Sequence, residues 1–309
     1  MDIFLQQVIN GLVLGSVYAL VALGYTMVYG ILGLINFAHG EVVMVGALTS
    51  LSVIATLMGS SIGLPGPLIV ILALAVAMSV CMLLGFTIER VAYRPLRRAP
   101  RLAPLITAIG VSMLLQTLAM MYWGRRYHTF PEVLKPTRHV FLGAVITDLQ
   151  IVIIVLSALL MAGLLLLVHF TRLGRAMRAT SESQLLAGLM GVDTNKIISA
   201  TFIIGSALAA IAGLLVSANY GVAQYTMGFI LGLKAFTAAV LGGIGNLGGA
   251  MLGGLLLGLI ESIGAGYIGD LTGGFLGSHY QDVFAFVVLV AVLVFRPTGL
   301  LGERVSQRA

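Results

Sequence analysis

Seven stretches of this 309-residue chain contain no Asp, Glu, Lys or Arg, and they constrain the fold more than any other feature. They cover residues 3–38, 42–88, 102–124, 149–168, 197–233, 235–260 and 283–295. A helix crosses the bilayer core with about 20 apolar residues, and unsatisfied backbone groups in lipid cost several kcal/mol. The stretches therefore predict transmembrane α-helices. Only 9% of the residues are charged, against about 25% in soluble domains, which excludes a soluble globular enzyme.

Turn-forming residues divide the two longest stretches. A break at 30–36 leaves a helix at 5–30, and the Pro- and Gly-containing segment 59–67 separates helices at 42–58 and 68–89. Further helices are predicted at 103–123, 149–170, 197–218, 249–268 and 281–296, with a short or broken span at 227–245. The predicted fold is a single all-α polytopic membrane domain over 1–309, with about eight to nine transmembrane helices including broken or re-entrant segments.

Basic residues indicate the orientation. Five lie in segment 90–101, four in 172–196 and three in the tail from Arg296 to Arg308, which together make twelve of the seventeen Lys and Arg residues. Cytoplasmic loops carry an excess of basic residues, so these segments and the C-terminus are expected in the cytoplasm. Segment 124–148 must lie on the opposite side, although it also carries four basic residues, because a single helix separates it from each neighbour. The net charge of +6 is therefore attributed to topology and membrane lipid, with no nucleic-acid partner.

Motifs of catalysis are absent from the sequence. It contains no HExxH, no GxSxG, no P-loop and no Cys/His spacing typical of a metal site. No cofactor or metal is expected in this chain, and any use of ATP requires a partner subunit. A polytopic membrane protein that is not an enzyme is therefore the expected class.

Two segments, 40–47 and 243–250, share the spacing Gly, five residues, Gly-Ala. Inverted repeats with discontinuous helices are common in transporters, so the match favours a translocation pathway. Chance similarity is the alternative, because the chain has 39 glycines.

Polar residues within the apolar stretches are candidates for that pathway. Asn36, His39 and Glu41 follow the predicted break, where they could bind a substrate carboxylate or ammonium, or form a satisfied network that fixes two helices. Glu261 lies inside a predicted span and needs a partner, for which Lys234 is a candidate; the pair could line the pathway or be structural. A single-chain transporter coupled to protons through Glu261 or Glu41 is a rival interpretation.

Glycines recur every fourth residue at Gly245, Gly249 and Gly253. This spacing places them on one helix face, so close packing against another helix is predicted.

Segment 171–196 is a polar stretch between two predicted spans. A cytoplasmic helix is predicted at about 175–190, followed by a turn at 191–195. Such a helix could dock on a soluble partner and pass its motion to the adjoining spans, or it could be an interfacial connector.

This segment contains a motif that resembles a known cytoplasmic loop. Glu182, Gly188 and Ile198 match the skeleton of the cytoplasmic loop of ABC permeases, although Ser183-Gln184 and Thr201 depart from it. Longer motifs are GYTMVYGI at 24–31, INFAHGE at 35–41, IERVAYRPLR at 88–97, KAFTAAVLGGIG at 234–245 and PTGLLG at 297–302. Together they span nearly the whole chain, and they resemble the motifs of LivH-type permeases of branched-chain amino acid ABC transporters.

The resemblance implies a heteromeric importer of leucine, isoleucine and valine. Its other parts would be a second related permease, two cytoplasmic ATPase subunits that bind ATP, and an extracytoplasmic substrate-binding protein. Arg175, Glu182, Gly188 and Gly191 are the residues expected to couple this chain to the ATPases. Similar permeases carry urea, amides or other amino acids, so those cargoes remain alternatives, and a non-transporting membrane subunit is a third class.

Overall fold

The computed structural model describes residues 2–60, 63–97, 99–100, 102–133, 137–141, 143–271 and 281–302. Arg98, Arg101 and the tail residues Arg304 and Arg308, which contributed to the predicted orientation, lie outside this set. The chain forms two compact units. Unit 1 comprises Met1–Thr26, Pro136–Gly163 and Lys234–Ala309, and unit 2 comprises Met27–Lys135 and Leu164–Leu233.

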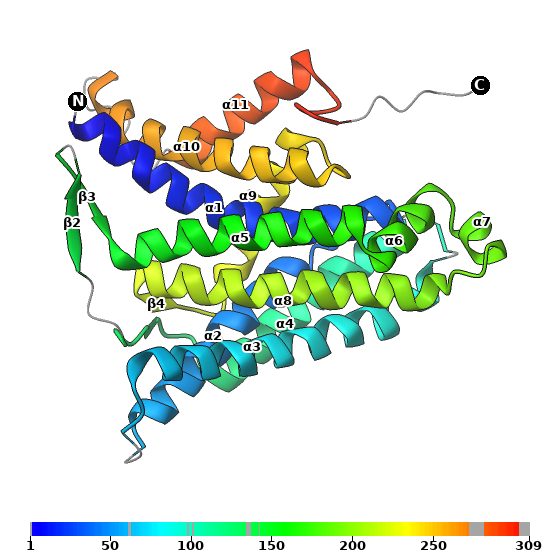
Figure 1. Cartoon of the computed structure of the whole chain (residues 1–309), viewed down its shortest axis with the longest axis horizontal. Coiled ribbons are helices and arrows are strands. Elements are labelled where there is room, and N and C mark those ends of the chain that lie inside the picture. Colours follow the sequence, from blue (N-terminus) through cyan, green and yellow to red (C-terminus); the bar gives the residue numbers. More distant parts are fainter. Residues whose placement is uncertain are drawn as a thin grey trace. The chain divides into compact units, whose positions relative to one another are not determined.

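Within the described residues, seven helices are long and apolar enough to cross a membrane, which confirms the all-helical polytopic class. Figure 1 shows how these helices follow one another along the chain. They are α1 (Asp2–Leu32), α2 (His39–Met58), α3 (Gly66–Ile88), α4 (Leu102–Trp123), α5 (Asp148–Phe170), α8 (Thr194–Tyr220) and α10 (Leu247–Leu271). Two shorter apolar helices are α9 (Met227–Gly242) and α11 (Gln281–Phe295). At 1.5 Å per residue the 16 residues of α9 extend about 24 Å, which agrees with the short span predicted at 227–245.

Unit 2 is built around α2, α3 and α8, which pack directly against one another. Small residues allow their backbones to approach closely. A β-carbon at Gly46 would lie 2.7 Å from the α-carbon of Ala210, and one at Gly213 would clash with the carbonyl oxygen of Val43. Close packing of small residues replaces the hydrophobic effect as the source of helix association inside a bilayer.

Unit 1 packs α10 against α1 and α9 through glycines. A β-carbon at Gly254 would lie 2.5 Å from the α-carbon of Ala19, and β-carbons at Gly249 and Gly253 would meet the backbone of α9. Gly245 departs from the prediction. It lies in the turn before α10 with φ 99°, because the helix begins only at Leu247, so it is not part of the helical glycine face.

The proposed repeat differs in backbone conformation at its first glycine. Gly40 lies within α2, whereas Gly243 has φ 108° and precedes α10. The shared spacing in sequence therefore does not give the same local structure at this position.

Short strands lie in segments between the predicted spans. β2 (Arg138–Phe141) and β3 (Ala144–Thr147) form an antiparallel hairpin, and β1 (His128–Thr129) pairs with β4 (Val222–Ala223). The side-chain amide of Gln6 donates to the Val145 carbonyl at 3.0 Å and accepts from the Val145 N–H at 2.8 Å. These two bonds place the beginning of α1 beside the hairpin.

Segment 171–196 contains two helices instead of one. α6 (Arg172–Glu182) and α7 (Gln184–Leu189) are separated at Ser183, whose backbone is extended at φ −159° and ψ 114°. The Ser183 hydroxyl accepts a hydrogen bond from the Leu186 N–H at 3.2 Å and so caps α7. The single helix predicted at 175–190 is wrong because the serine side chain competes for a backbone group and starts a new helix.

Candidate functional site

The α6–α7 loop is attached firmly to the helix that precedes it. Gly174, Met177 and Thr180 form the buried face of α6, and the Arg178 guanidinium donates to the carbonyl oxygens of Val168 and His169 at the end of α5. The last carbonyls of a helix have no partner within the helix, and a cation there also interacts favourably with the helix dipole. These contacts attach α6 to the last turn of α5.

Three side-chain caps define the successive helices of this region. Thr171, Ser183 and Asp193 accept backbone hydrogen bonds at the starts of α6, α7 and α8. The backbone hydrogen bond from Lys196 lowers the pKa of the Asp193 carboxyl from its ordinary value of 3.8. These polar residues are the sequence signal that could have located all three helix starts.

The opposite surface of the loop is exposed and apolar at α7. Leu185, Leu189 and Met190 are 75%, 76% and 85% exposed. Gly188 has no atom within 4 Å of the position that a β-carbon would take, and Gly191 ends the helix with φ 84°. Of the other predicted coupling residues, Arg175 and Glu182 are exposed on α6. An apolar patch on a polar connecting segment is typical of a protein-binding surface.

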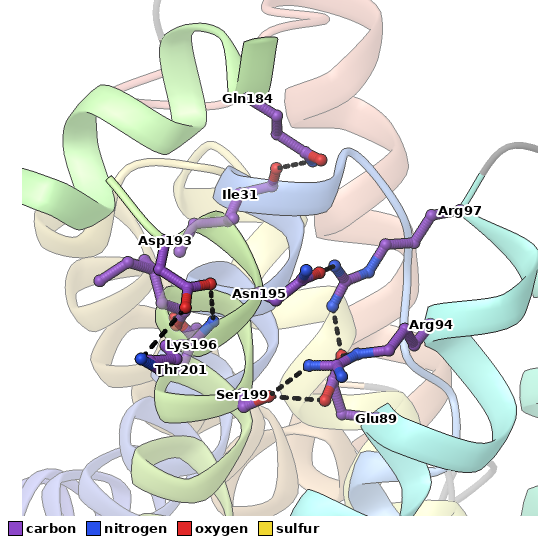
Figure 2. A network of polar contacts seen from close by, with 11 residues as sticks. Ile31, Glu89, Arg94, Arg97, Gln184, Asp193, Asn195, Lys196, Ser199 and Thr201 are labelled. Atoms are coloured by element: carbon purple, nitrogen blue, oxygen red, sulfur yellow. Dashed lines mark hydrogen bonds and ion pairs between the residues drawn. The ribbon is translucent and has the colours of Figure 1, made fainter. Parts of the chain in front are cut away.

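The loop also contacts the end of α1. Figure 2 shows the Gln184 side chain directed at the carbonyl oxygen of Ile31, to which its amide donates at 3.4 Å. α1 ends at Leu32, and Gly33 follows with φ 63°, so the predicted break after α1 is confirmed.

Only Asn36 of the three polar residues predicted at the break lies in it. Its Oδ1 accepts from the Tyr93 hydroxyl at 2.9 Å and from the Ala38 N–H at 3.1 Å. His39 and Glu41 instead belong to the first turn of α2, because α2 begins three residues earlier than predicted. Both side chains are buried.

Glu41 is a fully buried carboxylate with unequal oxygens. Oε1 accepts from the Ser112 hydroxyl at 3.0 Å and from the Gln116 amide at 2.7 Å, both on α4. Oε2 has no hydrogen-bond partner in the part of the chain that the structure describes. A β-carbon at Gly228 of α9 would lie 2.7 Å from this oxygen, so the glycine leaves it space. Since an unpartnered buried oxygen costs free energy, Oε2 is suited to receive a proton or an ammonium donor.

Glu261 and Lys234 form the ion pair that the sequence suggested, within unit 1. Glu261 Oε1 bonds the Lys234 ammonium, and Glu261 Oε2 accepts from the Tyr18 hydroxyl at 2.9 Å. The ammonium also lies 5.8 Å from the centre of the Tyr18 ring. The carboxylate and the ammonium thus neutralise each other, and the cluster joins α1, α9 and α10.

No group of three or more His, Cys, Asp or Glu side chains that could hold an ion occurs among the described residues. Ser112 and Gln116 are not evident as site residues from the sequence, because neutral polar side chains in an apolar helix give no distinctive pattern.

A family model described as "Branched-chain amino acid transport system / permease component" matches residues 7–293. The chain belongs to this family. It is therefore a permease component, which is a transport subunit rather than an ATPase. This membership favours a multi-component system over the single-chain secondary transporter and over the non-transporting subunit.

Curated relatives agree with the family over nearly the full chain. The BraD permease protein of a high-affinity branched-chain amino acid transport system from Pseudomonas aeruginosa is 50% identical, covering 97% of this chain and 96% of the relative. The corresponding LivH protein of Escherichia coli K12 is 46% identical with the same coverage. A LivH protein of Methanocaldococcus jannaschii is 28% identical over 97% of this chain and 94% of the relative. No solved structure matches at a significant level.

Proposed function

We propose that this permease component imports leucine, isoleucine and valine as part of an ABC transporter in the bacterial inner membrane. Its partners would be a second related permease, two cytoplasmic ATPase subunits that bind ATP, and an extracytoplasmic binding protein that delivers the cargo. The family match over 7–293 carries this proposal. The names of the BraD and LivH relatives support the choice of cargo.

The proposed orientation has the N-terminus outside and the C-terminus in the cytoplasm. Gln6 contacts the β2–β3 hairpin, which a single helix, α5, separates from the basic α6–α7 loop. The Leu300 and Leu301 N–H groups bond the carbonyls of Leu241 and Gly242, so the tail lies beside the α9–α10 turn. If α9 crosses the membrane, that turn is on the same side as the α6–α7 loop, in agreement with the positive-inside rule.

The exposed apolar face of α7 is proposed as the ATPase-docking surface. Arg175, Glu182, Gly188 and Gly191 would contribute to it, since all four lie on or next to the exposed side of the loop. Closure of the ATPase dimer would displace α6 and α7, and the caps and the Arg178 contacts would transmit that displacement to α5 and α8.

Glu41 is proposed as the polar contact for the cargo ammonium in the translocation pathway. Its support is the buried Oε2 without a partner among the described residues. Asn36 is proposed to have a structural role, since Tyr93 and Ala38 both donate to its Oδ1. His39 lies in the first turn of α2 together with Glu41. Lys234 and Glu261 are proposed as a structural ion pair because they already neutralise each other.

The test is purification of the tagged chain from its native membrane in mild detergent, with and without Gly188→Trp, followed by identification of bound ATPase subunits. A tryptophan at this open position is accommodated by the isolated chain but would obstruct a docked partner. Recovery of ATPases that falls with the substitution is the expected result. Recovery that is equal in both samples would contradict the docking surface.

Uptake by reconstituted complexes then identifies the cargo. Leucine, isoleucine and valine should be taken up in an ATP-dependent manner, while urea and short amides should not. Uptake of urea alone would replace the proposed cargo within the same transporter class. Uptake without any ATPase, abolished by an uncoupler, would return the single-chain ion-coupled mechanism.

A further inference from the structure

Glu89 is a fully buried carboxylate at the end of α3 that the transport proposal above does not use. It begins a π-helical turn, Glu89–Tyr93, which is followed by a 3₁₀ turn, Arg94–Leu96. Its side chain is 0% exposed. Short π-helical turns within α-helices occur frequently at functional sites.

Both oxygens of Glu89 have donors. Oε2 accepts from the Ser199 hydroxyl of α8 at 2.7 Å. Oε1 accepts from Arg94 Nε at 3.4 Å and from the Arg97 guanidinium. Figure 2 shows the Glu89 side chain between these arginines and Ser199. The carboxylate therefore joins its own turn to the helix that follows the α6–α7 loop.

Arg97 makes a second connection to α8. Its Nη1 donates to the Asn195 side-chain oxygen at 2.7 Å, while its Nη2 bonds Glu89. Arg94 Nη2 lies 3.4 Å from the Ser199 hydroxyl oxygen. The Arg94 side chain is 32% exposed and that of Arg97 is 14% exposed. Two arginines at the protein surface thus hold one buried carboxylate, and all three bond the first turns of α8.

The same turn is fixed on its other side by Tyr93. The tyrosine hydroxyl donates to Asn36 in the break after α1, and the ring lies 5.4 Å from the ring of Phe202 on α8. The orientation of the turn relative to α8 is therefore specified by a ring contact as well as by charge.

This network lies next to the proposed docking surface in the chain. α8 begins at Thr194, directly after the turn that ends α7, so Asn195 and Ser199 are its second and sixth residues. These two residues are thus the part of α8 that lies nearest to α7 in the chain. A buried ion pair is weak evidence for stability, because an apolar replacement of similar volume is often as stable. What the ion pair provides is a defined geometry between two helices.

We propose that Glu89 is a positioning residue for transport: through Ser199, Arg94 and Arg97 it holds the end of α3 to the start of α8, so that both helices move together when the α6–α7 loop is displaced. The inference rests on the proposed ABC transport function. Without the Glu89 carboxylate, α8 follows the loop and α3 does not, and ATP is hydrolysed without a matching movement of cargo.

The experiment measures leucine imported per ATP hydrolysed by the complete transporter in proteoliposomes, for the unaltered chain and for Glu89→Gln. The glutamine keeps the size of the side chain and removes its charge. Loss of one charge-assisted hydrogen bond lowers the equilibrium constant for the contact between α3 and α8 by roughly tenfold or more. The amount of leucine imported per ATP hydrolysed should therefore fall by about that factor, while ATP hydrolysis and subunit recovery persist. A ratio within twofold of the unaltered value would overturn the proposal.

Matched variants keep the result interpretable. Glu132→Gln removes an exposed carboxylate from the segment after α4 and should leave the ratio unchanged. If Glu89→Gln fails to assemble, Ser199→Ala removes only one donor and must still lower the ratio; an unchanged ratio in that variant also overturns the proposal. If the unaltered complex imports no leucine, the proposed cargo fails, and the ratio is measured with the cargo that the uptake panel identifies.

Discussion

Leu189 offers the sharpest test of the α7 docking surface. Its side chain is 76% exposed, so Leu189→Ala removes little that stabilises this chain by itself. Substitutions at exposed positions usually change the free energy of unfolding by less than about 0.5 kcal/mol. A defect in this variant would therefore be a defect of association.

The expected magnitude follows from the exposed area. Full burial of a leucine side chain is worth about 1.5–3 kcal/mol, and three-quarters of that is about 1–2 kcal/mol on docking. Affinity for the ATPase subunits should therefore fall by about 5- to 30-fold. The dissociation constant is measured with the permease in nanodiscs and the ATPase subunits that co-purify with it.

The control is Leu118→Ala on α4. Leu118 is 51% exposed but lies in a predicted membrane span, so its removal should leave the dissociation constant unchanged. The reasoning is refuted if Leu189→Ala binds the ATPases within twofold of the unaltered chain. It is equally refuted if Leu118→Ala weakens binding as much as Leu189→Ala, since the effect would then not be specific to α7.

Three other predictions concern packing and charge. Gly213→Ala should destabilise the chain by about 1–3 kcal/mol, because its β-carbon would clash with the Val43 carbonyl. Gly110→Ala has open space around the new β-carbon, so it should be neutral or stabilise by about 0.5–1 kcal/mol. Thermal melting in detergent distinguishes the two variants, and equal shifts in melting temperature would contradict the packing argument. Lys234→Met should lower the free energy of unfolding by about 3–5 kcal/mol, because it leaves Glu261 buried without its cation. Adding Glu261→Gln should restore most of that free energy. A double variant as unstable as the single one would refute a structural ion pair. Since the pKa of Asp193 is lowered from 3.8, its charged cap is complete above that value and is lost only as the pH falls through the lowered pKa. Asp193→Asn should therefore change the melting temperature by the same amount at pH 5 and pH 8, and an effect confined to pH 8 would be inconsistent with this pKa.

The spans were predictable because each depends on local composition. Segments 42–58 and 103–123 match α2 and α4 within three residues at either end, since the free energy of placing a stretch in lipid is close to a sum over its own side chains. The exact start of α2 decides where the polar residues His39 and Glu41 lie. Moving its start from 42 to His39 converts two predicted break residues into helical ones, and helix ends are the least certain part of any sequence prediction.

The candidate site was predictable only in part. Glu41 and Glu261 stood out because carboxylates are rare in apolar spans. Ser112 and Gln116, which bond Glu41, give no such signal, whereas Ser183 is a residue type that favours helix N-caps. The hairpin at 138–147 is not evident from the sequence, because its strands have only four residues each.

The sequence by itself determined that the chain is a membrane permease, which of its segments are long and apolar enough to span a membrane, and to which family it belongs. Those properties follow from runs of apolar residues and from motifs that are contiguous in the chain. Only the tertiary structure decided which charges have partners. Glu261 bonds a lysine 27 residues away and Glu89 a serine 110 residues away, whereas one oxygen of Glu41 has no hydrogen-bond partner in the described chain. Such pairs depend on how each helix is rotated about its axis and packed against the others, which no local pattern specifies.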